Sequence, residues 1–277
     1  MQTTIGFIGS GNMAECIASG LIKKQWDSKQ IMVFSPNAVD KAWIQHNQIR
    51  LASNITQLTD NCEMLILATK PQQAQRALAE VSLTPKQCLI SVAAGISISF
   101  INQVLSSEEP NHIIRAMPNT PSLIDSGICG LFADNSTRDS FGEIAESIFS
   151  SVGSFVWVKQ ESLMDAVTAI SGSGPAYYFL FLEGMISAGI ELGLEKDVAT
   201  KLATDTFSGA AALLKSKETD PTLLRQQVTS PGGTTAAAIG SFQDNNLQQV
   251  ILKAVSTAKD RGILLNKDCL NRLKNKQ

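Results

Sequence analysis

The sequence lacks the residues and motifs of several common enzyme classes. Only two histidines occur, His46 and His112, and they stand far apart in the chain, which makes a poor start for a metal site. There is no Ser-His-Asp order, no H-E-x-x-H, no P-loop lysine motif and no pair of acids in a plausible cleft. We therefore expect no bound metal and none of the hydrolytic chemistry that these motifs carry.

Charge of one sign and long apolar runs are also scarce. The net charge of -2 leaves no basic surface for nucleic acid. The most apolar stretch, Pro175–Leu182, ends at Glu183 and is too short to span a bilayer. No basic and apolar leader precedes the first expected strand. We expect no secretory signal and no membrane partner.

Cysteine is present without a pattern. The five cysteines are odd in number, and no two of them form a C-x-x-C pair. We interpret them as reduced thiols in the core of a cytoplasmic protein. The remaining composition, 44% hydrophobic and 17% charged, is that of a globular chain, and 277 residues correspond to one large or two ordinary domains.

The first twenty residues carry the most informative pattern. A short apolar run, Ile5–Ile8, is followed at once by a G-x-G-x-x-A turn over residues 9–14 and by a helix-period pattern. Strand, glycine turn and helix in this order form the first unit of a dinucleotide-binding fold, in which the helix N-terminus meets the pyrophosphate. Close-packing glycines are the alternative interpretation. The candidate cofactor-binding residues here are Gly9, Ser10, Gly11, Asn12 and Met13.

Short apolar runs then alternate with helical patterns as far as residue 158. The expected strands are Ile5–Ile8, Ile31–Phe34, Met64–Leu67, Leu89–Val92, His112–Met117, Ile128–Ala133 and Phe155–Val158. The further expected helices are Ala38–His46, Gln72–Val81, Ser97–Leu105 and Arg138–Ser151. This alternation predicts an α/β fold with a mostly parallel, doubly wound Rossmann-type sheet covered on both faces. Ser97 and Thr137 are expected helix N-caps, and Pro71 suits a first helical position.

The pattern changes after Gln160, where no convincing strand remains. The expected helices are Leu163–Ile170, Pro175–Leu192, Lys196–Lys215, Pro221–Val228, Thr234–Phe242 and Leu247–Arg261. We therefore predict a dinucleotide-binding domain at residues 1–160 and an all-α domain at residues 161–277. The polar end of the chain, residues 266–277, is expected to fray.

The expected helix Pro175–Leu192 is apolar almost all round in its first half. Such a helix must be buried on most sides, and a small helical domain has difficulty enclosing it alone. It is either a central core helix or part of an interface between subunits, and we favour the interface.

In open α/β sheets, ligands bind at the carboxyl ends of the strands. After the expected strand Ile31–Phe34, Ser35 and Asn37 offer neutral groups where NAD enzymes usually carry an acid, and the first acid is Asp40. This favours NADP over NAD, although the arginine common in NADP enzymes is absent too.

Three later strand ends carry further candidates. These residues are Ala68, Thr69, Lys70, Pro71, Ala93, Ala94, Gly95 and Asn119. The ammonium of Lys70 is placed to reach cofactor or substrate, unless it is an ordinary exposed lysine before a helix. Residues 93–95 are small enough to leave space for a flat ring, or they form a plain turn. Asn119 lies in a loop between two prolines, which could present polar groups to a ligand.

A second glycine loop lies in the helical half, ahead of the expected helix Thr234–Phe242. Its glycines, hydroxyls and helix N-terminus make an anion-binding site that suits a small carboxylate. The alternative is a flexible turn capped by Thr234. The candidate substrate residues here are Ser230, Gly232, Gly233, Thr234 and Thr235.

Together these segments resemble the pyrroline-5-carboxylate reductase family, from Ile5 to about Lys267. The most specific matches are Ala169-Ile-Ser-Gly-Ser-Gly-Pro-Ala-Tyr177 and Ser230-Pro-Gly-Gly-Thr-Thr235. The turn at residues 9–14 and Ala68-Thr-Lys-Pro-Gln72 match as well. Like this chain, the family lacks an acid after the second strand.

The resemblance implies reduction of 1-pyrroline-5-carboxylate to L-proline by NADPH, with NADH used less readily. It places phosphate and ribose contacts on Ser35, Asn37 and Asn54, and the nicotinamide beside residues 68–71 and 93–95. It makes Thr235 the hydroxyl near the ring nitrogen of the substrate. It also implies a homodimer through the helical domain, assembled in many members into decamers.

Three other functions compete with this one. A β-hydroxyacid dehydrogenase needs a lysine on the helix after the nucleotide domain, and Pro175–Leu192 carries none. A reductase of a related, six-membered cyclic imine is harder to exclude. A non-catalytic NADP-binding regulatory paralogue would be expected to have degraded glycine loops, whereas both are intact here.

Overall fold

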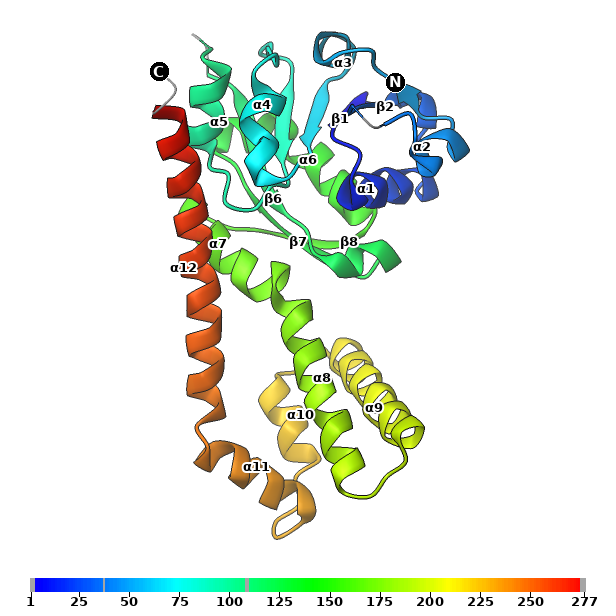
Figure 1. Ribbon diagram of the computed structural model, residues 1–277, viewed down its shortest axis with the longest axis vertical. Helices are drawn as coiled ribbons and strands as arrows, with labels where there is room; N and C mark the ends of the chain where they lie inside the picture. Colours follow the sequence, from blue (N-terminus) through cyan, green and yellow to red (C-terminus); the bar gives the residue numbers. More distant parts are fainter. Residues whose placement is uncertain (1–2, 37, 108–109, 275–277) are drawn as a thin grey trace. The chain divides into compact units, whose positions relative to one another are not determined.

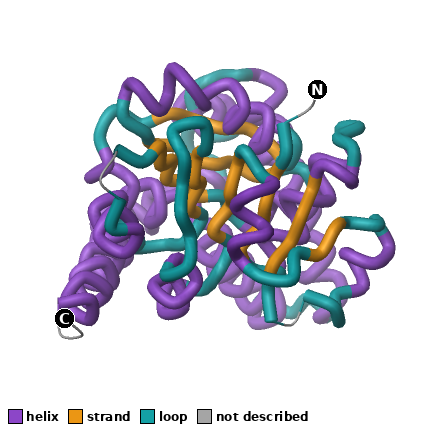
Figure 2. Tube along the Cα trace, turned by 90° about the horizontal axis from the view of Figure 1, so that it is seen from above, coloured by secondary structure: helices purple, strands orange, loops and turns teal. Residues whose placement is uncertain are grey.

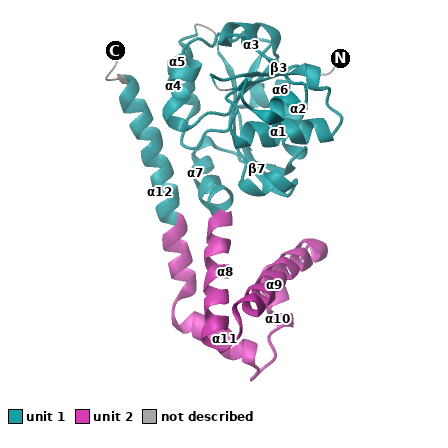
Figure 3. Cartoon of the chain, turned by 45° about the vertical axis from the view of Figure 1, so that its right-hand side comes forward, with its two compact units in different colours: residues 1–173, 256–277 teal, residues 174–255 magenta. Residues whose placement is uncertain are grey.

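The computed structural model describes residues 3–36, 38–107 and 110–274. It contains two compact units (Figure 3). The nucleotide unit comprises Met1–Ser173 and Ser256–Gln277, and the helical unit comprises Gly174–Val255. These units are defined by their internal contacts, whereas the boundary expected at residue 160 marks the end of the strand pattern. The division into domains at residues 1–160 and 161–277 stays a prediction.

The nucleotide unit is built on one sheet of eight strands in the order β3-β2-β1-β4-β5-β6-β7-β8. The strands are β1 (Ile5–Ile8), β2 (Ile31–Phe34), β3 (Arg50–Leu51), β4 (Met64–Leu67), β5 (Cys88–Ser91), β6 (His112–Met117), β7 (Gly127–Phe132) and β8 (Gly153–Trp157). All neighbours pair in parallel except β6 and β7. The mostly parallel, doubly wound sheet is therefore confirmed, and β3 is an addition to the expected strands.

Helices cover the sheet on both sides (Figures 1 and 2). Those of the nucleotide unit are α1 (Asn12–Lys23), α2 (Ala42–His46), α3 (Ile55–Asn61), α4 (Ala74–Leu78), α5 (Ile98–Leu105), α6 (Asn135–Ser150) and α7 (Met164–Val167). Successive strand residues point to opposite faces of the sheet, so one strand contributes side chains to the two hydrophobic cores, one on each face. Phe7 packs in the core under α1 and α6, and Ile8 in the core under α3, α4 and α5.

The helical unit contains α8 (Gly174–Glu191), α9 (Lys196–Lys217), α10 (Pro221–Gln227), α11 (Thr234–Asp244) and the first part of α12 (Leu247–Lys274). No strand occurs among the described residues after Trp157, as the loss of strand periodicity predicts. Within this unit α8 packs against α9, where Gly189 allows close approach: a Cβ there would lie 3.1 Å from Ala199 Cβ.

The expectation that residues 266–277 fray is wrong for the part that the structure describes. Helix α12 continues to Lys274. Its last turns place Cys269, which is buried, with Leu270 and Leu273 against the core under α4 and α5. These three apolar side chains lie on one side of the helix and bind this segment to the sheet domain.

Of the two expected helix caps, Ser97 is confirmed and Thr137 is wrong, and the alternative in which Thr234 caps α11 is wrong as well. Ser97 caps α5 as predicted, its Oγ accepting from Phe100 N at 3.1 Å. Helix α6 is capped by Asp134, whose carboxylate accepts from Thr137 N at 2.8 Å, so Thr137 lies inside the helix. Helix α11 has Gly233 at its N-cap and Thr234 as its first residue.

Candidate functional site

The turn between β1 and α1 has the geometry that a dinucleotide-binding loop requires. Gly9 has a φ of 112°, and a Cβ there would lie 2.7 Å from the carbonyl oxygen of Ala68. The N–H of Gly9 donates to Phe34 O at 2.8 Å, which ties the turn to the end of β2. Only glycine tolerates this conformation and this approach together.

Gly11 differs from Gly9, because nothing within 4 Å would meet a Cβ there. It is the N-cap of α1, and no side chain caps this helix end. The first N–H groups of the helix therefore keep their capacity to bind an anion, and the space in front of Gly11 is open. Ser10 is buried and Asn12 is exposed, while Met13 is half-buried against the core. This free space beside a helix N-terminus fits the pyrophosphate of a dinucleotide.

The end of β2 carries neutral groups. Ser35 is half-buried, its carbonyl accepts from Ala38 N at 3.0 Å, and Asp40 is exposed. Asn37 lies outside the described residues. Asn54 is exposed and caps α3, with its Oδ1 accepting from Gln57 N at 2.7 Å. No acid therefore directly follows β2 where NAD enzymes usually hold the ribose.

The end of β4 carries a buried polar atom without a partner. The Oγ1 of Thr69 is buried and makes no hydrogen bond, although its neighbour Ala68 continues the β-ladder to Ile8 O at 2.9 Å. Buried hydroxyls normally have a partner, so an orphan at a strand end points to a ligand. Lys70 is exposed beside it, and Pro71 begins a short 3-10 turn before α4.

The end of β5 carries the small residues that leave room for a ring. Ala93 and Gly95 are buried, and Ala94 is half-buried. Gly95 has a φ of 69°, and a Cβ there would lie 3.0 Å from the Cβ of Leu265 on α12. The second half of α12 thus supports this loop from one side.

Asn119, expected to bind substrate, is already engaged by the protein. It is 9% exposed, its Nδ2 donates to Ser171 O at 3.1 Å and its Oδ1 accepts from Ile128 N at 3.0 Å. The side chain thereby ties the loop after β6 to β7 and to the chain leading into α8. The backbone carbonyl of Asn119 also accepts from Ser122 N at 3.1 Å.

An ion pair between a buried arginine and a partly exposed glutamate, beside the loop after β5, was missed by the sequence reasoning. Arg115 on β6 is 7% exposed and donates from NH1 to Glu161 Oε1 at 3.0 Å. The same carboxylate oxygen accepts from Ile98 N, the first residue of α5, at 2.8 Å. The available signal was a charged residue inside the otherwise apolar run His112–Met117, since buried charges need partners.

Asp165 lies near this pair. Burial raises the pKa of its carboxyl above the usual range; Arg115 lowers that pKa, Glu161 raises it and Lys259 lowers it. Its Oδ1 lies against α12, where a Cβ on Gly262 would come within 2.9 Å of it. The charges of β6, α7 and α12 therefore meet at one place in the nucleotide unit.

The second glycine loop belongs to the helical unit. Ser230, Gly232, Thr234 and Thr235 are exposed, and Gly233 is half-buried. The carbonyl of Ser230 accepts from Gly233 N at 3.1 Å, and no side chain caps α11. The loop thus presents the free N–H groups of a helix end to solvent, next to an exposed Thr235.

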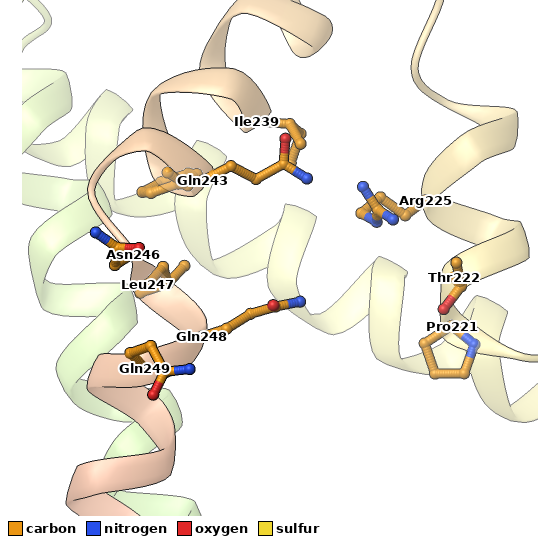
Figure 4. Close-up of a pocket in the computed structure, with 10 residues that line it drawn as sticks. Pro221, Thr222, Arg225, Ile239, Gln243, Asn246, Leu247, Gln248 and Gln249 are labelled. Atoms are coloured by element: carbon orange, nitrogen blue, oxygen red, sulfur yellow. The ribbon is translucent and has the colours of Figure 1, made fainter.

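The helical unit has a pocket of about 440 Å³ between α10 on one side and α11 and α12 on the other. Gln243 and Gln248 extend into it from one side and Arg225 from the other (Figure 4). None of the predicted substrate residues lines this pocket, so it is separate from the second glycine loop.

The apolar surface expected on α8 is open in the single chain. Tyr178, Phe179, Leu180 and Phe181 are 60%, 58%, 68% and 49% exposed. Monomeric proteins seldom leave a contiguous apolar surface uncovered. Among the described residues no helix is both long and apolar enough to cross a membrane, and no cluster of three potential metal ligands occurs.

Comparison with known proteins agrees with this arrangement. Residues 161–264 match a family model described as pyrroline-5-carboxylate reductase dimerisation. Residues 4–95 match a model described as NADP oxidoreductase coenzyme F420-dependent.

Individual relatives match along the whole chain. A pyrroline-5-carboxylate reductase from Pseudomonas aeruginosa is 38% identical over 93% of this chain and 94% of its own length. The structure of a pyrroline-5-carboxylate reductase from Coxiella burnetii has a TM-score of 0.86 at 36% identity, covering 96% of this chain and 99% of that one. A pyrroline carboxylate reductase from Plasmodium falciparum with NADP bound has a TM-score of 0.81 at 27% identity, covering 96% and 98%. The dinucleotide turn, the second glycine loop and these full-length similarities establish that the chain belongs to the pyrroline-5-carboxylate reductase family of oxidoreductases.

Proposed function

We propose that this chain reduces 1-pyrroline-5-carboxylate to L-proline, with NADPH as the preferred cofactor and NADH as a weaker one. The observation that carries the proposal is the pair of uncapped helix N-termini, one behind Gly11 and one behind Gly233. The first suits a pyrophosphate and the second suits the carboxylate of a small substrate. The reaction itself is inferred from the similarity of nearly the whole chain to the family.

The cofactor is held by the segments that follow β1, β2, β3, β4 and β5. The residues proposed to contact it are Gly9, Ser10, Gly11, Asn12, Met13, Ser35, Asn37, Asn54, Ala68, Thr69, Lys70, Pro71, Ala93, Ala94 and Gly95. A bound reduced nicotinamide supplies the hydride for the C=N carbon. The preference for NADPH follows from the neutral groups after β2, which do not repel a 2′-phosphate.

Two residues in the loop after β4 have chemical roles in this proposal. The orphan hydroxyl of Thr69 gains a partner when a polar ligand fills the site. The exposed ammonium of Lys70 adds positive charge beside the anionic cofactor or substrate.

Asn119, in the loop after β6, acts indirectly, because both of its side-chain groups hold the neighbouring loops in place.

The substrate is held by residues 230–235 of the helical unit. Backbone N–H groups of Gly232 and Thr234 bind its carboxylate, together with the Ser230 hydroxyl, while the N–H of Gly233 closes the turn by its bond to Ser230 O. A cyclic imine is basic enough to be protonated in water, so the reaction needs no strong acid. The pKa of a threonine hydroxyl is too high for an ordinary acid near neutrality. Thr235 therefore orients the ring nitrogen by a hydrogen bond or relays a proton to it.

The apolar surface of α8 is the proposed contact between two copies of this chain, since the matched family model describes dimerisation over residues 161–264. Assembly of such dimers into a decamer is a further part of the proposal. We place the enzyme in the cytoplasm because its five cysteines are free and buried, which suits a reducing compartment.

Steady-state kinetics with purified protein test the function. We expect NADPH oxidation with 1-pyrroline-5-carboxylate, slower oxidation of NADH, and no reaction with NADP and 3-hydroxyisobutyrate. A six-membered cyclic imine serves as the comparison substrate, and faster turnover of that ring would contradict the assignment. Tight NADPH binding without turnover of either imine would instead identify a non-catalytic regulatory protein.

A further inference from the structure

The loop after β5 is fixed at both of its sides within the nucleotide unit. At its start it follows a buried strand, and at its middle Gly95 approaches Leu265 of α12. At its end Ser97 caps α5, and the next N–H, that of Ile98, donates to the carboxylate of Glu161 at 2.8 Å. Glu161 lies 63 residues further along the chain. This bond is therefore tertiary and ties the loop to the segment before α7.

The position of Glu161 is itself determined by Arg115. The guanidinium is almost completely buried, and its NH1 donates to the same Oε1 that accepts from Ile98 N, at 3.0 Å. A charge buried to this degree must be paired, because an unpaired one would be costly. The carboxylate is thus held between an arginine on β6 and the N-terminus of α5.

We propose that Glu161 is a positioning residue for the cofactor, which acts by holding the loop of residues 93–97 through Ile98 N. This inference rests on the proposed function, in which Ala93, Ala94 and Gly95 lie against the nicotinamide. The loop contains a left-handed glycine and two alanines, and Ala93 and Ile96 are buried in the core under α4 and α5. The bond from Ile98 N to Glu161 holds the end of the loop that enters α5, and Arg115 acts on the loop through Glu161.

A proline at Ile98 removes one hydrogen bond, together with part of a side chain that packs against the core under α4 and α5. Proline suits the first position of a helix, where it lacks only the N–H group. The residue before a proline must be extended, and Ser97 already has φ −84° and ψ 159°. Ile98→Pro therefore deletes the donor to Glu161 and leaves the Arg115 pair intact. Ile98→Ala is the matched control, because it trims the side chain and keeps the N–H.

The test measures the dissociation constant for NADPH by fluorescence, with kcat and KM for both substrates and a thermal melt. Ile98→Pro should weaken NADPH binding about tenfold relative to Ile98→Ala, the ratio that about 1.4 kcal/mol produces. Glu161→Gln keeps an acceptor oxygen and should stay within about threefold of wild type in NADPH affinity. Glu161→Ala should weaken NADPH binding at least as much as Ile98→Pro and should also lower the melting temperature, because it leaves Arg115 without its partner.

Asp125→Asn is the control for loss of an ion pair elsewhere, since the Lys23–Asp125 pair is exposed. Asp125→Asn should change neither the dissociation constant for NADPH nor kcat and KM. Equal NADPH affinity in Ile98→Pro and Ile98→Ala would overturn the inference, even if melting temperatures differ. Failure of the wild-type protein to reduce the imine would instead refute the proposed function, so the two failures are distinguishable.

Discussion

The two glycines of the first turn should respond to the same substitution in opposite ways. Gly9→Ala places a methyl group 2.7 Å from the carbonyl oxygen of Ala68, on a residue with φ 112°. The strained backbone costs about 1–3 kcal/mol. Relief of the contact with a buried backbone atom costs about 1–3 kcal/mol more. We expect the free energy of unfolding to fall by about 2–6 kcal/mol, a large part of the total stability of a typical domain.

Gly11→Ala should leave folding almost unchanged, because its φ is −76° and no atom lies within 4 Å of the added Cβ. The poorer N-cap and the reduced freedom of the unfolded chain offset each other within about 1 kcal/mol. NADPH affinity should nevertheless fall roughly 10- to 100-fold, as loss of one or two charge-assisted bonds to the backbone implies.

Urea unfolding followed by circular dichroism measures the stability of each variant, and NADPH fluorescence measures the affinity. The combination separates a structural glycine from a ligand-facing one. Unchanged stability of Gly9→Ala would refute the argument from close approach. Wild-type affinity of Gly11→Ala would show that the phosphate does not lie in front of this helix.

Three further results are expected. Thr235→Ala should lower kcat about ten- to a thousandfold with little effect on NADPH binding, since Thr235 acts at the substrate nitrogen, and full activity would remove it from the mechanism. Asp134→Ala should lower the free energy of unfolding by about 1 kcal/mol at pH 7. Burial raises the pKa of the Asp134 carboxyl, but the hydrogen bonds from Thr137 and Ser136 outweigh it, so the pKa lies below its usual value. The loss in Asp134→Ala should therefore shrink as the pH falls below 3.8, which unfolding at pH 7 and pH 3 would check. Burial raises the pKa of the Cys16 thiol to about 11 and that of Cys62 to about 12, so a disulfide reagent at pH 8 should label these thiols quickly only after unfolding.

The parts of the fold that depend on local pattern could be predicted from the sequence. Apolar runs with flanking turns located β1, β2, β4, β5 and β6 within a residue or so, because strands buried on both faces leave a continuous apolar signal. The two-residue strand β3 and the short α3 were missed. Neither has a run long enough to stand out, and Arg50 and Leu51 on β3 are exposed.

The errors occurred where tertiary contacts decide the structure. The polar residues around Cys269 read as a fraying tail, yet this cysteine and two leucines pack on the sheet domain. Thr137 and Asp134 are both good caps, and only the position of the backbone chooses between them.

The candidate site likewise has a part that the sequence predicts and a part that depends on tertiary contacts. The turn around Gly9 is a contiguous motif, so its sequence alone indicates its geometry. The bond from Ile98 to Glu161 and the pair between Arg115 and Glu161 join residues 63 and 46 positions apart. No spacing in a single sequence could indicate them. The partner for Arg115 could be expected in principle, but its identity required the fold.

Helix α12 has a consequence for anyone who wishes to isolate the nucleotide unit. This unit is discontinuous in sequence, because the chain departs after Ser173 and returns at Ser256. A fragment ending near residue 160 or 173 would lose the buried Cys269 and the support that Leu265 gives to Gly95. A stable minimal nucleotide-binding protein would instead need residue 173 joined by a designed linker to the second half of α12. Viewed as an assembly of parts, the helical unit is an insertion between the sheet of the nucleotide unit and the second half of α12.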